Sequence, residues 1–230
     1  MFRATIRLGK ILGIPIRLDY SWFIIFELLT FQLARLGYTE YGPQLGGAAF
    51  RYFLSAITAI LLFGSILLHE LGHSYVALRK GIAIRSITLF IFGGVAETTE
   101  EPRTATEEFE IAAAGPLVSV AIAAVAWSLE TLGGRGPSHT REPLIYLPIW
   151  LTFILNYLSS VNATIVIFNM IPGFPLDGGR IFRAILWKVT GNLKSSDKGG
   201  ATASQLKTET TLNTDRAAPS ADPTAEFPGR

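Results

Sequence analysis

The chain has 230 residues, of which 49% are hydrophobic and 17% charged, and its mean hydropathy is +0.37. Soluble domains carry about a quarter charged residues, so this composition favours a membrane protein. The formal net charge of +2 is small and dispersed, which argues against a nucleic-acid-binding protein. Cysteine is absent, so disulfides, a thiolate nucleophile and cysteine metal ligands are excluded, and any bound metal must use His, Asp or Glu.

Basic residues before the first apolar run predict a cytoplasmic flank rather than a removable signal peptide, because no small-residue cleavage site follows them. These residues are Arg3, Arg7, Lys10 and Arg17. If the N-terminus is inside, the cytoplasmic loops also collect most of the other Lys and Arg residues. We therefore expect a multi-pass integral protein of the cell membrane, with its N-terminus in the cytoplasm.

Four membrane spans are predicted, at about residues 20–36, 52–78, 109–132 and 144–171. A helix needs roughly 20 apolar residues to cross a bilayer, so the first span is short and the last is long enough to tilt. The predicted fold is an all-α membrane protein, a bundle of about four transmembrane helices.

The segment at residues 82–97 breaks this helical pattern. It reads IAIRSITLFIFGGVAE, is rich in Ile, Phe, Val and Thr, and contains the pair Gly93-Gly94. Such a composition favours extended strands with a bend at the glycines, so we predict a small membrane-associated β-sheet here. A re-entrant helical segment is the alternative.

The sequence His69-Glu70-Leu71-Gly72-His73 closes the second apolar run. Residues four apart lie on one face of a helix, so His69 and His73 can bind one metal ion. Zinc lowers the pKa of a bound water to about 7, and Glu70 could take its proton. Three such residues in an apolar span are costly without a function, although neighbouring helices could also satisfy them.

A catalytic zinc usually has three protein ligands, and the third candidate is Asp177. It lies in NMIPGFPLDGGR, which begins at Asn169 and ends the fourth predicted span on the same side of the membrane as His69 and His73. The prolines and glycines there interrupt the helix, and irregular backbone at membrane depth is tolerated only where it is buried or lines a cavity. A capping Asp at a helix terminus is the alternative. The acidic stretch with Glu97, Glu100 and Glu101 is better explained as a solvated loop.

HELGH together with NMIPGFPLDGGR resembles the site-2 protease family of intramembrane zinc metalloproteases, from the N-terminal flank to about Trp187. This resemblance implies that His69, His73 and Asp177 bind one zinc ion and that Glu70 is the general base. It also implies that Asn169 positions substrate or stabilises the oxyanion, for which a buried Asn bonded to backbone is the alternative. The glycine-containing segment matches the family's membrane-associated sheet, which could bind a substrate in extended form.

The expected domain organisation is an intramembrane metalloprotease domain at residues 1–191 and a disordered polar tail at 192–230, because the tail has almost no large apolar side chains. The resemblance implies a short member that lacks the C-terminal spans and the CBS or PDZ domains of some relatives. Its expected partners are single-span membrane protein substrates and the lipid bilayer, with no nucleic acid. A further protein partner or an oligomer stays open, as do an inactive or partner-dependent protease relative and a membrane zinc-binding protein.

Overall fold

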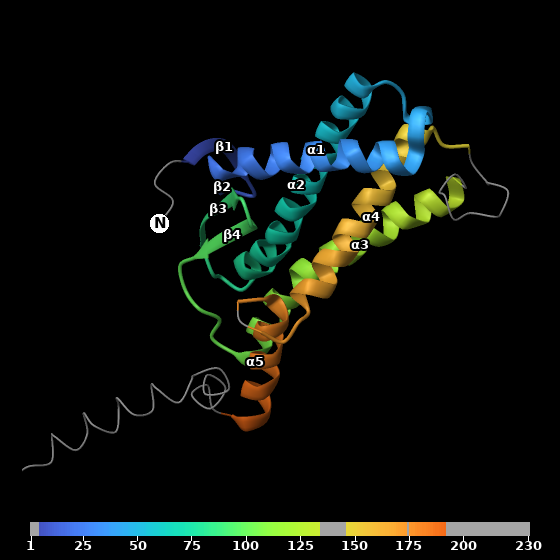
Figure 1. The fold of residues 1–230 in the computed structure, drawn as a ribbon. Helices are drawn as coiled ribbons and strands as arrows, with labels where there is room; N and C mark the ends of the chain where they lie inside the picture. The colour runs from blue at the N-terminus through green and yellow to red at the C-terminus, as the bar shows by residue number, and fades with distance from the viewer. Residues whose placement is uncertain (1–4, 134–145, 174, 192–230) are drawn as a thin grey trace, which may run out of the picture.

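The structure is a computed structural model that describes residues 5–133, 146–173 and 175–191 (Figure 1). The tail at 192–230, for which we predict disorder, lies outside these residues. The helices are α1 (Ser21–Tyr41), α2 (Ala48–Arg79), α3 (Ala105–Gly133), α4 (Ile149–Asn169) and α5 (Asp177–Thr190), with a short 3-10 helix, η1 (Gly42–Leu45), between α1 and α2.

The mainly helical membrane fold is confirmed, but three helices in the described part of the chain, rather than four, are long and apolar enough to cross a membrane. These are α2, α3 and α4. Helix α1 covers the first predicted span and has 21 residues, but Glu27, Gln32 and Arg35 interrupt its apolar sequence. Helix α4 begins at Ile149, whereas the last span was predicted to begin at about residue 144.

A four-stranded sheet accompanies the helices, in the order β1-β2-β3-β4. The strands are β1 (Thr5–Ile11), β2 (Ile14–Asp19), β3 (Ile84–Phe90) and β4 (Gly93–Thr98). The predicted sheet at 82–97 is present as the antiparallel β3–β4 hairpin, and the helical alternative for it is wrong. Gly93 has a φ of +130°, which explains a glycine at the bend.

The two N-terminal strands were not predicted, because their basic residues make the segment similar to a cytoplasmic flank of a membrane span. In β2, Ile14, Ile16 and Leu18 are buried and alternate with less buried residues. Parallel pairing of β2 with β3 joins this N-terminal hairpin to the β3–β4 hairpin. The apolar face of the sheet packs on Leu71 and Ala77 of α2.

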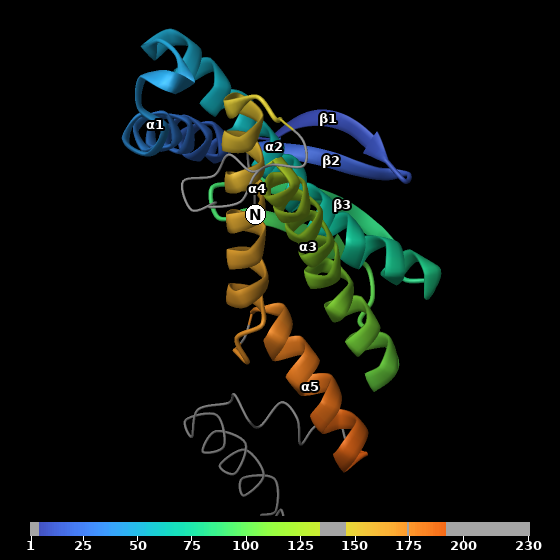
Figure 2. The ribbon, with the colours of Figure 1, turned by 90° about the vertical axis from the view of Figure 1, so that its right-hand side faces the viewer.

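Helix α3 lies between α2 and α4 and also contacts α5 (Figure 2). Helix α1 runs at a steep angle across one end of this bundle, whereas the sheet lies along the side of α2 (Figure 1). A second apolar core joins α1, α2 and α4 around Phe153, which is fully buried. This packing leaves the C-terminal part of α2, the middle of α3 and the start of α5 close together.

Candidate metal centre

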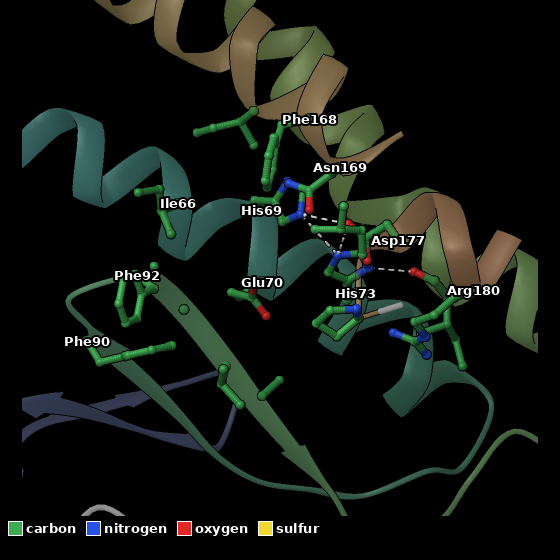
Figure 3. Close-up of a pocket in the computed structure, with 18 of the residues that line it drawn as sticks. Ile66, His69, Glu70, His73, Phe90, Phe92, Phe168, Asn169, Asp177 and Arg180 are labelled. Atoms are coloured by element: carbon green, nitrogen blue, oxygen red, sulfur yellow. Dashed lines mark hydrogen bonds and ion pairs between the residues drawn. The ribbon is translucent and has the colours of Figure 1, made fainter. Parts of the chain in front are cut away.

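His69 and His73 lie one turn apart on α2 and are 4% and 8% exposed. Both imidazole rings lie on the side of α2 that faces α3 and α5 (Figure 3). Their Nε2 atoms are 3.1 Å apart, as the four-residue spacing predicts for imidazoles that share a ligand.

Asp177 is the first residue of α5 and is buried beside the two histidines. The chain returns to this position after α4 through the turn that follows Asn169, where Leu176 N donates a hydrogen bond to Gly173 O. Gly178 makes the return possible, because a Cβ at this residue would lie 2.5 Å from the carbonyl carbon of Met170. The irregular segment between α4 and α5 therefore places the Asp177 carboxylate against α2, the helix that carries the two histidines.

One carboxylate oxygen of Asp177 contacts both histidines. Its Oδ2 lies 3.2 Å from His69 Nε2 and 3.2 Å from His73 Nε2. Burial alone would raise the pKa of Asp177, but the adjacent imidazoles of His69 and His73 outweigh burial and hold this pKa well below its ordinary value. The Asp177 carboxyl group is therefore ionised at neutral pH.

The outer nitrogen of each histidine is bound by α3. His73 Nδ1 lies 2.7 Å from the carbonyl oxygen of Ile111, and His69 Nδ1 lies 2.9 Å from Ser119 Oγ. A carbonyl oxygen only accepts hydrogen bonds, so the Nδ1 of His73 is the donor and a neutral His73 has its lone pair on Nε2. That lone pair faces Asp177 and His69.

Gly115 of α3 closes the other side of this cluster. A Cβ at Gly115 would lie 2.1 Å from His73 Nε2 and 2.7 Å from His69 Nε2. Only glycine leaves room for the two imidazoles to turn their Nε2 atoms toward α3. The histidine spacing in the sequence contains no signal for Gly115, Ile111 or Ser119, because these residues belong to another helix.

Residues 57–140 and 145–206 match Peptidase family M50. The chain belongs to this family. The resemblance to the site-2 protease family inferred from HELGH and NMIPGFPLDGGR is thereby confirmed.

Named relatives agree with this assignment. The protein sll0528 of Synechocystis, named as a zinc metalloprotease, is 40% identical over 206 residues, which is 88% of this chain and 48% of that protein. The zinc metalloprotease MJ0392 of Methanocaldococcus jannaschii is 39% identical over 192 residues, which is 84% of this chain and 48% of that protein. The chain thus spans about half the length of these two relatives.

A solved structure supports the fold as well. The site-2 protease from Methanocaldococcus jannaschii aligns with a TM-score of 0.51 and 37% sequence identity, covering 85% of this chain and 77% of that one. The small sheet beside long apolar helices is therefore consistent with the site-2 protease fold.

The cluster in this M50 chain has the dimensions of a zinc site. Two ligands about 2.1 Å from a tetrahedral zinc ion lie about 3.4 Å apart. The three donor atoms of His69, His73 and Asp177 are separated by 3.1–3.2 Å. Lone pairs of two imidazoles and a carboxylate at these distances repel one another unless a cation or protons lie among them. The donor set also suits zinc, which binds His and Asp.

Glu70 and Asn169 lie on the wall of a cavity of about 990 Å³ that also opens onto the three metal-ligand candidates (Figure 3). Glu70 follows His69 on α2 but stays outside the cluster of donor atoms. Asn169 is the last residue of α4. The structure thus places both predicted catalytic residues beside the cluster, whereas Glu100 pairs with Arg103 on the surface.

Strand β4 forms the opposite wall of this cavity. All of its residues except Glu97 line the cavity, and β4 is an edge strand of the sheet. Gly94 packs so closely on Glu70 that a Cβ there would lie 2.6 Å from Glu70 Cγ. The edge of the sheet therefore passes directly over the glutamate of the HELGH sequence.

Proposed function

We propose that this chain is a zinc-dependent intramembrane endopeptidase that hydrolyses peptide bonds of membrane-spanning substrates near the cytoplasmic side of the bilayer. The observation that carries the proposal is the meeting of His69, His73 and Asp177 beside Glu70, at a cavity between apolar helices and strand β4. The protease domain is assigned to residues 1–191. Its proposed place is the cell membrane, with the N-terminus in the cytoplasm.

In this proposal His69 and His73 would hold the ion through Nε2, and Asp177 would hold it through a carboxylate oxygen. A bound zinc ion would supply Lewis acidity to the scissile carbonyl and to a nearby water. The Glu70 carboxylate takes a proton from the attacking water and later delivers it to the leaving amine. The side-chain amide of Asn169 donates a hydrogen bond to the developing oxyanion.

The substrate binds in extended form along β4. A transmembrane helix hides its carbonyl groups in internal hydrogen bonds, so a scissile bond must be unwound before water can attack it. An edge strand offers backbone donors and acceptors that replace those bonds. Because Gly94 of β4 contacts Glu70, a strand added at this edge would carry its carbonyl groups past the general base.

The first experiment compares the full chain with Glu70→Gln, purified in detergent. Each protein is assayed for bound zinc and for cleavage of a synthetic transmembrane peptide. We expect zinc in both proteins and a loss of cleavage of about 10²–10⁴-fold in the variant, the range for a general acid–base group. Glu97→Gln makes the same chemical change on β4, outside the cavity lining, and serves as the matched control.

The alternatives predict other outcomes. Zinc in both proteins with no cleavage by either would favour an inactive or partner-dependent relative, and equal cleavage by both would remove Glu70 from the mechanism. A native chain without zinc would contradict the proposal as a whole.

A further inference from the structure

One buried face of α3 contacts the proposed metal centre, or the helix that carries Asp177, at several positions along its length. The residues on this face are Glu108, Ile111, Gly115 and Ser119, spaced three or four positions apart, as residues on one side of a helix are. Glu108 pairs with Arg183 of α5, Ile111 O accepts from His73, and Gly115 leaves room for both Nε2 atoms. Ser119 is the last member and contacts His69.

The two outer contacts of the histidines differ in kind. The carbonyl oxygen of Ile111 can only accept, so it permits one neutral tautomer of His73. The hydroxyl of Ser119 can donate or accept, so the 2.9 Å contact with His69 Nδ1 is compatible with either tautomer of His69. The proton position on His69 is therefore the adjustable feature of the cluster.

A metal ion requires the lone pair of His69 on Nε2, because that atom faces His73 and Asp177. The proton must then be on Nδ1, and Ser119 Oγ must accept it. If the hydroxyl were missing, the buried Nδ1–H would have no acceptor in its place. The other tautomer would instead direct an Nε2–H at Asp177 Oδ2, 3.2 Å away, and this hydrogen bond competes with metal for both ligands.

We propose that Ser119 is a positioning residue: its hydroxyl accepts a hydrogen bond from His69 Nδ1 and so keeps the Nε2 lone pair directed at the metal. Both side chains are buried, with Ser119 at 0% and His69 at 4% exposure, so water does not replace the hydroxyl readily. This inference rests on the proposed function, since it assigns Ser119 to the zinc site of that function. Loss of such an outer partner typically weakens metal binding about 10–100-fold.

The test is the isosteric pair Ser119→Thr and Ser119→Val in the full chain. Both variants add a branch at Cβ and the same bulk, so they share any packing penalty at this buried position, and they differ in hydroxyl against methyl. Zinc dissociation constants are measured in detergent by competition with a chromophoric chelator. We expect the Val variant to bind zinc about 10–100-fold more weakly than the Thr variant.

Ser159→Ala is the control, because Ser159 is also buried in a helix and its hydroxyl donates to a backbone oxygen, that of Asn156, rather than to a histidine. It should bind zinc as the native chain does. Equal zinc affinities of the Thr and Val variants, with a zinc-binding native chain, would overturn the role of Ser119 alone. A native chain that binds no zinc would overturn both this inference and the proposed function.

Discussion

Gly115 is the residue at which the proposed metal centre tolerates least change. A methyl group there would lie 2.1 Å from His73 Nε2 and 2.5 Å from His73 Cε1, far inside van der Waals contact. We expect Gly115→Ala to displace the imidazoles and to weaken zinc binding by more than the roughly 10–100-fold that loss of an outer partner costs. Zinc bound per chain after purification measures this effect.

Gly64 provides the matched control for that substitution. It lies inside α2, and a Cβ at Gly64 would have no neighbour within 4 Å. Gly64→Ala should therefore keep its zinc. Full zinc binding by Gly115→Ala would mean that the histidines do not turn their Nε2 atoms toward α3 when the ion is bound.

Asn169 poses a different question, because its side chain lies on the cavity wall and outside the metal-ligand cluster. If its amide stabilises the oxyanion, Asn169→Ala should keep zinc and KM near native values and lower kcat about 10²–10³-fold. Steady-state kinetics on a transmembrane peptide separates the two constants. A native kcat in this variant would mean that Asn169 has a structural role at the end of α4 and does not stabilise the oxyanion.

The ligand set could be predicted from the sequence because its signals are local. The helical spacing of His69 and His73 places them on one face, and the broken helix before Asp177 needs a reason at membrane depth. Ser119 and Gly115 could not be found this way. Their importance depends on which side of α3 faces α2, and that follows from packing rather than from any short pattern.

Among the elements, α5 is attached to α3 by an ion pair between a buried Glu108 and a partly exposed Arg183. Arg183 Nε donates to Glu108 Oε1 at 2.9 Å, and Arg183 Nη2 binds the same oxygen, while Glu108 is only 1% exposed. Helix α5 has 14 residues and is not among the membrane-spanning candidates, so side contacts such as this one set the position of Asp177 at its start.

Glu108→Gln should therefore weaken the attachment of α5 to α3 and, through the position of Asp177, weaken zinc binding. Replacing a charged hydrogen-bond partner also removes about 1.5–3 kcal/mol of stability. Chelator competition gives the zinc affinity, and denaturant unfolding in detergent gives the stability. Glu110→Gln is the control, since Glu110 pairs with Lys80 at a much more exposed position and such a pair contributes about 0–1 kcal/mol. Equal effects of the two substitutions would contradict a special role of the Glu108–Arg183 pair.

The sheet shows which elements sequence reasoning can and cannot find. The β3–β4 hairpin has β-branched and aromatic residues and glycines at its bend, which are strong strand signals. The alternation of Ile14, Ile16 and Leu18 was available too, but basic residues on the other face made the segment resemble a membrane flank. Parallel pairing of β2 with β3, across about 70 residues, depends on tertiary structure alone.

At the scale of the whole molecule, the sheet restricts the path of the chain. Strands β1 and β2 precede α1, strands β3 and β4 follow α2, and all four share one sheet. Helices α1 and α2 therefore leave the sheet and return to it. If α2 crosses the bilayer toward the sheet, α1 must carry the chain to the opposite side, although its polar residues make it the least apolar of the four long helices.

This path of the chain predicts that two exposed residues, Thr39 near the end of α1 and Thr99 just after β4, lie on opposite sides of the membrane. The chain has no cysteine, so Thr39→Cys and Thr99→Cys each introduce a single reactive thiol. A membrane-impermeant maleimide applied to intact cells should label the Thr39 variant, and applied to inverted vesicles it should label the Thr99 variant. Labelling of both from the same side would mean that neither α1 nor α2 carries the chain across the bilayer. The basic N-terminal flank and the metal centre would then have to be reassigned relative to the bilayer, because both are connected to the sheet.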